Sequence, residues 1–231
     1  MTDARSVART SSTYKLRRRA MAPARQDRFV AWLERWGLDE SGPPLDWTGV
    51  FGRRHDVVLD IGFGHGESVL DLARRVPATD VVGIEVHTPG AATVLDAIER
   101  DALENVRVVF GDGLRFLDRV PAESLAAVRV LFPDPWPKPR QHHRRMVAAD
   151  TIAAFTDRLR VGGTLHLATD IADYAAAMRT AADGEPRLAG GPIDRSTADR
   201  PLTRFEQRGI DDGRTATDLL YERRLNSGNA I

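Results

Sequence analysis

The chain has 231 residues, with 33 basic side chains, 33 acidic side chains and no cysteine, so its formal net charge is zero. The length suits one domain with a sizeable core, and the absence of cysteine excludes disulfides and thiolate chemistry. No apolar run reaches the length of a membrane span and the N-terminus lacks a signal-peptide core, so we expect a cytoplasmic protein without a membrane partner.

The first segment differs from the rest of the chain in composition. Residues 1–24 are polar and basic, and we expect them to form a flexible arm, with a solvated tail as the alternative. Residues 25–231 are expected to form a single domain. Its first element is predicted to be a short amphipathic helix at residues 25–37, in which Trp32 and Trp36 are packing residues.

From residue 57 onward, apolar runs alternate with helical patterns, which is typical of parallel βαβ units. We expect strands at residues 57–61, 80–86, 106–110, 125–132, 164–168 and 216–224. We expect helices at residues 67–76, 89–101, 113–119, 147–160 and 171–183, the fourth of them stopped by Gly162-Gly163. The predicted fold class is therefore α/β, with a mostly parallel sheet and helices on both faces.

A glycine loop follows the first of these strands. It reads Asp60-Ile61-Gly62-Phe63-Gly64-His65-Gly66, and glycine permits a positive φ and a close approach of a ligand to the main chain. A dinucleotide fingerprint would need a third glycine where Glu67 stands, which disfavours a nucleotide-dependent dehydrogenase. The alternative is a glycine turn of some other α/β domain.

Acids recur at the ends of four successive predicted strands: Asp60, Glu85, Asp112 and Asp134. Ligands of such sheets bind at the carboxyl ends of the strands, so we expect one shared crevice. Glu85 lies at the usual spacing for an acid that accepts ribose hydroxyls, and its alternative is a surface charge. Asp112 could accept from an adenine amino group or cap a helix.

A proline-rich loop comes next and is followed by a basic cluster. Four prolines between residues 133 and 139 make the loop stiff, and the loop carries Asp134 and Trp136. An acid and an aromatic beside basic residues could hold a base and its phosphates, whereas a structural turn with a solvated flank is the alternative. The adjacent His142 and His143 lack further ligands at suitable spacing, so we expect no metal.

Five motifs occur in a fixed order along the chain. They are Asp60-Ile61-Gly62-Phe63-Gly64, Gly83-Ile84-Glu85-Val86-His87, Phe132-Pro133-Asp134-Pro135-Trp136, Ala168-Thr169-Asp170 and Thr203-Arg204-Phe205-Glu206. Together they resemble the bacterial tRNA (guanine-N7)-methyltransferase family, over about residues 14–224. The resemblance implies a Rossmann-like class I methyltransferase with a seven-stranded sheet. It also implies S-adenosylmethionine as methyl donor, S-adenosylhomocysteine as product and guanine 46 of the tRNA variable loop as target.

The resemblance also implies roles for particular residues. Asp134 would be the catalytic residue, an acidic side chain in the active site. The cofactor would be bound by Asp60, Gly62, Gly64, Glu85, Asp112 and Asp134. The target nucleotide would contact Lys138, Asp170, Thr203, Arg204, Phe205 and Glu206. The tRNA would contact Arg140, Gln141, His142, His143, Arg144 and Arg145.

Some of these residues have structural alternatives. Asp170 could cap the helix at residues 171–183, and the stretch 203–206 could be an ordinary loop that packs Phe205 inward. Gln141 and His143 stand where histidine and lysine are usual in the family, which weakens the basic flank at neutral pH.

Guanine N7 carries a free lone pair and no proton, so its methylation needs no general base. We therefore expect Asp134 to act by charge and orientation, accepting from guanine N1–H and N2–H. A small-molecule methyltransferase and a non-catalytic RNA-binding protein with a cofactor pocket are the competing hypotheses. The sequence does not decide between a monomer and a homodimer.

Overall fold

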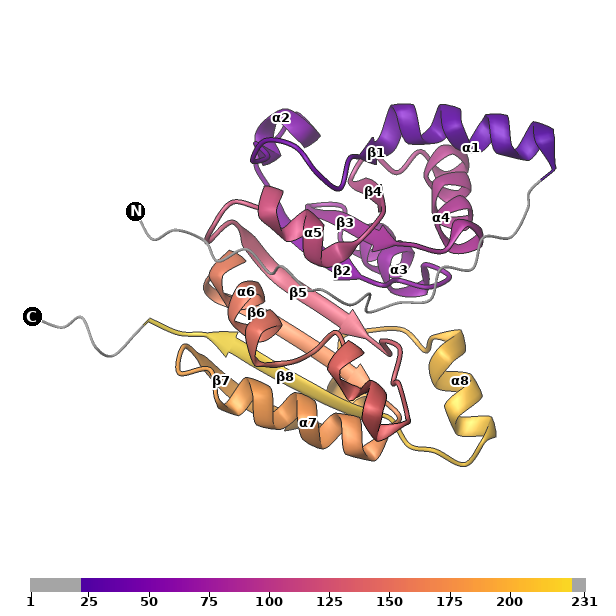
Figure 1. Ribbon diagram of the computed structural model, residues 1–231. Helices are drawn as coiled ribbons and strands as arrows, with labels where there is room; N and C mark the ends of the chain where they lie inside the picture. The colour runs from indigo at the N-terminus through magenta and orange to yellow at the C-terminus, as the bar shows by residue number, and fades with distance from the viewer. Residues whose placement is uncertain (1–21, 226–231) are drawn as a thin grey trace, which may run out of the picture.

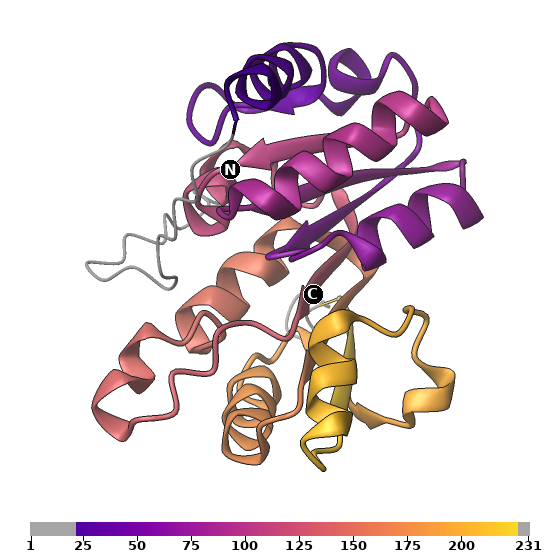
Figure 2. The same ribbon diagram turned by 90° about the vertical axis from the view of Figure 1, so that its right-hand side faces the viewer.

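The computed structural model describes residues 22–225, so all but the last three residues of the predicted arm at 1–24 lie outside the described part. One eight-stranded sheet forms the middle layer, in the order β1-β4-β3-β2-β5-β6-β8-β7 (Figures 1 and 2). The strands are β1 Gly37–Leu38, β2 Asp56–Ile61, β3 Thr79–Glu85, β4 Val106–Phe110, β5 Leu125–Leu131, β6 Leu159–Thr169, β7 Leu188–Ile193 and β8 Thr217–Arg223.

Strands β1 to β6 pair in parallel, and β8 is antiparallel to both β6 and β7. The strand order reverses at β2, which has β3 on one side and β5 on the other. Five of the six β2 residues are buried, as expected for a central strand covered on both faces. A switch in strand order opens a crevice at the carboxyl ends of the strands, which is where a ligand of such a sheet binds.

Helices cover both faces of the sheet (Figure 1). One face is covered by α1 Pro23–Trp36, α3 Glu67–Arg75 and α4 Thr88–Asp101, whose apolar side chains pack on Val58, Val81 and Val108. The opposite face is covered by α5 Gly113–Phe116, α6 Ala149–Arg158 and α7 Ala172–Asp183. The remaining helical elements are α2 Trp47–Phe51, η1 Leu117–Arg119, η2 Pro139–Arg144, η3 Arg195–Thr197 and α8 Arg204–Asp211.

The predicted fold class is confirmed, and the strand count is eight rather than seven. The two strands without a predicted counterpart are β1 and β7. β1 has only two residues, and β7 reads Leu-Ala-Gly-Gly-Pro-Ile, which contains three residues that strands normally disfavour. Because β7 lies at the edge of the sheet, its proline does not interrupt a central hydrogen-bond ladder.

The helices agree with the prediction at the two tryptophans and differ from it at Gly162-Gly163. Trp36 is buried and Trp32 packs against the same core, which confirms their packing role. The predicted end of the helix at Gly162-Gly163 is wrong, because α6 ends at Arg158 and both glycines lie inside β6. Gly162 has a φ of 77°, so it serves an irregular stretch of strand where the pairing with β5 shifts register.

Candidate active site

The glycine loop connects β2 to α3 through three left-handed residues. Gly62, Gly64 and Gly66 have φ values of 75°, 61° and 89°, a region that side-chain-bearing residues rarely adopt. The start of α4 packs directly on this loop, since a Cβ at Gly90 would lie 1.9 Å from the Gly64 carbonyl oxygen. Glycine at these positions therefore allows the loop and α4 to approach closely.

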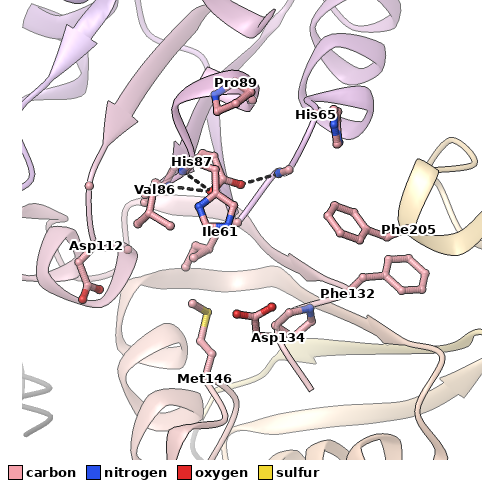
Figure 3. A pocket seen from close by; sticks show the side chains of 18 residues that line it. Ile61, His65, Val86, His87, Pro89, Asp112, Phe132, Asp134, Met146 and Phe205 are labelled. Carbon is pink, nitrogen blue, oxygen red and sulfur yellow. Dashed lines mark hydrogen bonds between the residues drawn. The ribbon is translucent and has the colours of Figure 1, made fainter. Parts of the chain in front are cut away.

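Glu85, at the end of β3, fixes the glycine loop through its buried carboxylate. Its oxygens accept hydrogen bonds from the backbone N–H groups of Gly64 at 2.7 Å, Val86 at 2.7 Å and His87 at 2.9 Å (Figure 3). A carboxylate has about four lone-pair positions, so one acceptor position remains for a ligand. The surface-charge alternative is wrong, because Glu85 is only 6% exposed.

A cavity of about 360 Å³ opens at the carboxyl ends of these strands. Its volume is in the usual range for a small-molecule site. Its lining brings together six residues that the sequence predicts for the site: Gly62, Gly64, Glu85, Asp112, Asp134 and Phe205. The six residues come from four strand ends, or the loops that follow them, and from α8. Helix α8 lies near the carboxyl end of β5 (Figure 1).

Asp60 is the one strand-end acid that does not line the cavity. Its side chain is 1% exposed, Ser68 Oγ donates to its Oδ2 at 2.5 Å, and its Oδ1 has no partner among the described residues. Burial raises the pKa of the Asp60 carboxyl, against the opposing effect of the Ser68 hydrogen bond. Three of the four acids thus share the crevice, and Asp60 is buried outside its lining.

Asp112 caps a helix and also lies at the cavity, so its location is compatible with both of the roles that the sequence left open. Its Oδ1 accepts from the Leu114 backbone N–H at 2.8 Å and so caps α5, which confirms the capping alternative. The residue also lines the cavity. Its own N–H donates to Glu40 Oε2 at 2.7 Å, which ties the segment after α1 to this side of the site.

The proline-rich loop turns sharply on either side of Asp134. Phe132 and Trp136 have φ values of 53° and 43°, which cost free energy for residues other than glycine. Asp134 is exposed and its carboxylate points into the cavity, on the side of Met146 (Figure 3). Trp136, by contrast, is 3% exposed and lies beneath Arg144, whose Cζ is 3.6 Å from the ring centroid. The expectation that Trp136 would face a base is therefore wrong.

The predicted basic flank divides into exposed and buried members. Lys138, Arg140 and His143 are exposed on and beside η2, while Gln141, His142 and Arg144 are half-buried. Arg145 is buried: its Nε donates to the Pro135 carbonyl at 2.9 Å and its Nη2 to Asp173 Oδ2 at 2.6 Å. Arg145 therefore fastens the proline-rich loop to α7.

Helix α8 brings Phe205 to the cavity. Thr203 caps the helix, since its Oγ1 accepts from the Glu206 N–H at 3.1 Å. Phe205 is 40% exposed, and its ring lies against the glycine loop, where a Cβ at Gly64 would come within 2.5 Å of it. Arg204 is exposed, and its Nε lies 3.3 Å from Glu67 Oε1.

Asp170 and Glu206 are engaged in ion pairs within the protein. Asp170 Oδ2 accepts from Arg214 Nε at 2.8 Å, and the residue does not cap α7, whose N-cap is Ile171. Glu206 is buried and accepts from Arg195 Nε and Arg200 Nη1, each at 2.6 Å. The sequence does not indicate a role for Arg195 or Arg200, because no local pattern distinguishes either arginine.

Two kinds of feature do not occur within residues 22–225. No three histidine or acidic side chains gather there in a way that could hold a metal ion. None of the described helices has both the length and the apolar character needed to cross a membrane.

Known structures share this fold. The 16S rRNA methyltransferase KamB superposes with a TM-score of 0.56 at 16% identity, covering 80% of this chain and 96% of that one. A "putative methyltransferase from streptococcus mutans in complex with SAH" gives a TM-score of 0.51 at 13% identity, covering 88% and 99% of the two chains. At such identities the likeness supports the fold alone.

Sequence relatives carry the assignment further. A family model described as "Putative methyltransferase" matches residues 54–219. The tRNA (guanine-N(7)-)-methyltransferase of Mycobacterium avium is 40% identical, covering 93% of this chain and 87% of the relative. The enzymes of the same name from Nitrosomonas europaea and Alkalilimnicola ehrlichii are 38% and 42% identical, covering 91% and 92% of this chain and 96% and 93% of the relatives. With this identity over nearly its whole length, the chain belongs to the tRNA (guanine-N(7)-)-methyltransferase family.

Proposed function

We propose that this protein transfers the methyl group of S-adenosylmethionine to N7 of guanine 46 in the variable loop of tRNA. The observation that carries the proposal is the single cavity in which the glycine loop and Glu85 face Asp134 and Phe205. A methyl donor and its acceptor must meet in one site, and this cavity brings the two sets of residues together.

The strand-end half of the cavity fits an adenosyl cofactor. At Gly62 an added Cβ would meet no atom within 4 Å, so bare main chain faces open space. Glu85 retains one acceptor position for a ribose hydroxyl, and Asp112 lies further along the same lining. When bound, S-adenosylmethionine supplies an electrophilic methyl group on a sulfonium centre. We propose no metal in this reaction, because a sulfonium methyl needs no further activation.

The other half of the cavity suits a guanine base. We propose that the Asp134 carboxylate accepts from guanine N1–H and N2–H together, a pattern that adenine does not offer. Phe205 and Phe132 line the same space and offer aromatic faces on which a base could stack. Because N7 is already a nucleophile, the protein's task is alignment, which can lower a barrier by up to roughly 7–11 kcal/mol.

The tRNA itself would contact the exposed cations beside the cavity. Lys138 and Arg140 project from the start of η2, next to the loop that carries Asp134. Arg145 is buried in an ion pair, so we propose that it shapes this surface without touching phosphate. Since tRNA is its proposed substrate, we propose that the protein acts in the cytoplasm.

Methyl transfer from labelled S-adenosylmethionine to an unmodified tRNA transcript tests the proposal. We expect one labelled nucleoside, 7-methylguanosine, mapped to position 46 of the tRNA. The matched control is the same tRNA with 7-deazaguanosine at this position, which keeps the Watson–Crick edge and lacks the nucleophilic nitrogen.

The rival functions give different results. A small-molecule methyltransferase would bind the cofactor and leave both transcripts unlabelled. A non-catalytic RNA-binding protein would bind tRNA with a steep salt dependence and yield no methylated product. Label on the 7-deaza transcript would show that N7 is not the acceptor.

A further inference from the structure

The sheet face covered by α1, α3 and α4 is apolar towards one edge of the sheet and polar towards the other. Over β2, β3 and β4 it is apolar and packs against these helices. Beyond β2 the same face carries Arg129 on β5 and His166 on β6, which are neighbours in register with Asp60. Asp218 on β8 extends this polar row, since His166 Nε2 lies 2.8 Å from its Oδ1. All these side chains are buried, so the row needs partners from whatever covers it.

Arg200, in the segment between η3 and α8, supplies the partner of Asp218. Its side chain is 0% exposed. Its Nε and Nη2 donate to the two Asp218 oxygens at 2.6 and 2.8 Å. Its Nη1 and Nη2 donate to the two Glu206 oxygens at 2.6 and 3.2 Å. One guanidinium therefore joins the last strand of the sheet to the first turn of α8 by two forked pairs, a geometry that lysine cannot reproduce.

The same guanidinium also reaches the loop that carries Asp134. Arg200 Cζ lies 5.1 Å from the centroid of the Phe132 ring, within the range of a cation–π contact. Phe132 is the left-handed residue from which the loop departs, two positions before Asp134. On the other side, Glu206 directly follows Phe205 in α8. Arg200 thus contacts Phe132, which precedes the Asp134 loop, and Glu206, which follows Phe205. Asp134 and Phe205 are the residues that face the proposed guanine.

We propose that Arg200 is a positioning residue that sets the distance between Phe205 and the Asp134 loop, and that Glu206 acts through Arg200 without touching the nucleotide. The inference rests on the proposed function, and it replaces the nucleotide contact that the family resemblance implies for Glu206. Glu206 has no oxygen free of arginine, because Arg195 donates to both oxygens from the solvent side, at 2.6 and 3.1 Å. Neither Arg200 nor Glu206 lines the cavity, so their effect on the substrate is indirect.

A double-mutant cycle with Arg200→Lys and Glu206→Gln tests the proposal, with kcat and KM for tRNA and Kd for S-adenosylhomocysteine as readouts. We expect each single variant to lower kcat/KM for tRNA by about 10-fold, and the double variant to fall within about twofold of the worse single variant. We expect Kd for S-adenosylhomocysteine to change by less than about twofold, because Glu85 and the glycine loop remain intact. Additive losses, or an equal loss of cofactor affinity, would overturn the proposal.

The matched control is Arg187→Lys, which weakens another ion-pair cluster, located at the other end of β8 from Asp218. Arg187 pairs with Asp157 at 2.5 Å and with Glu185 at 2.8 Å. We expect this variant to lose thermal stability while its kcat/KM for tRNA stays within about twofold of the unmodified protein. A tenfold loss there would show that ion-pair loss anywhere has the same effect, and the inference would fall.

A second measurement adds Glu206→Gln to Asp134→Asn and does not need Arg200→Lys to fold. If Glu206 touches no base, it can alter the ratio of rates on guanosine and inosine only through Asp134, so the ratio of the double variant equals that of Asp134→Asn. A further change of the ratio in the double variant would show a direct contact with N2–H and would overturn the proposal. Failure of the unmodified protein to methylate tRNA would refute the proposed function instead, so the two outcomes remain distinct.

Discussion

The two proposed halves of the cavity, one for the cofactor and one for the nucleotide, are built on different physical principles. The cofactor half rests on the absence of side chains: three left-handed glycines, and Gly90 packed against them. Its one charged support, Glu85, binds main-chain N–H groups. The nucleotide half rests on charge, through Arg145 with Asp173 and Arg200 with Asp218 and Glu206. Added bulk should therefore disable the first half, and neutralised charge should disable the second.

Asp134 lies where the halves meet, and its replacement should have the largest effect. Asp134→Ala is expected to lower kcat by about 100- to 1,000-fold, the usual loss when a polar group that stabilises the reacting complex is removed. Asp134→Asn keeps the volume and loses the charge, so it separates the two contributions. Single-turnover rates with guanosine and inosine tRNA measure both. Full rate and full preference in Asp134→Asn would mean that the charge is not what matters.

The charged half should weaken in acid. Hydrogen bonds from Arg200 and His166 outweigh the effect of burial and lower the pKa of Asp218 to about 2, from a reference value of 3.8. A depressed carboxyl pKa stabilises the fold above the unfolded-state pKa, and this contribution of about 2 kcal/mol is lost as the pH falls from about 4 towards 2. Asp218→Asn should therefore lose about 2 kcal/mol of unfolding free energy at pH 7.

Urea unfolding at pH 7 and pH 3 measures this effect in both proteins. The gap between the native chain and Asp218→Asn should narrow at the lower pH. A gap that stays constant would show that the Asp218 charge contributes nothing to the difference.

The glycine half should fail through bulk. Gly90→Ala places a Cβ at 1.9 Å from the Gly64 carbonyl oxygen, which forces the loop and α4 apart. Overpacking typically costs about 1–3 kcal/mol. If this cost reduces the free energy of cofactor binding, the affinity for S-adenosylhomocysteine falls about 10-fold or more. Isothermal titration measures the affinity.

Gly162→Ala is the control for Gly90→Ala. Gly162 has a φ of 77°, and a Cβ there would meet nothing within 4 Å. This variant should lose about 1–2 kcal/mol of stability from backbone strain alone. Its cofactor affinity should match that of the native chain, and equal affinity in Gly90→Ala would contradict the packing argument.

The smallest effect is expected at Lys138. Only Lys15 and Lys138 are lysines among the 33 basic residues, so a compact ammonium at the start of η2 suits a close phosphate or base contact. Lys138→Arg should raise KM for tRNA by about threefold and leave the cofactor affinity unchanged. Arg140→Lys is the reciprocal control, and an unchanged KM in Lys138→Arg would remove the inference.

The sequence predicts the glycine turn and the strand that ends at Glu85 well because their signals are local. Gly62 and Gly64 mark a tight turn within a few residues of the strand that precedes it, and Glu85 ends the next strand. The apolar runs of β2 to β6 are continuous because both faces of each strand are covered. These features depend on neighbours along the chain, and a pattern of neighbours is what a sequence displays.

The nucleotide half is less predictable because its contacts join distant residues. Nothing in the residues around Arg200 or Asp218 indicates that the two pair across 18 positions. Trp136 reads as an exposed aromatic in a polar loop, yet Arg144 covers it. β7 contains Gly-Gly-Pro, which strands normally disfavour, so its sequence does not indicate a strand. Its partner, β8, follows only after a helix. Tertiary charge pairing and edge pairing leave no periodic signal.

Phe132 and Trp136 hold left-handed backbones on either side of Asp134, and strain of this kind costs about 1–3 kcal/mol for each residue. That cost is met when the chain folds, before any ligand arrives, and Arg145 and Arg200 keep the loop in place. This loop therefore has little shape left to change when the substrate binds. We expect the adaptation to fall to the nucleic acid, whose guanine would leave its neighbours and rotate outward into a recess that is already formed.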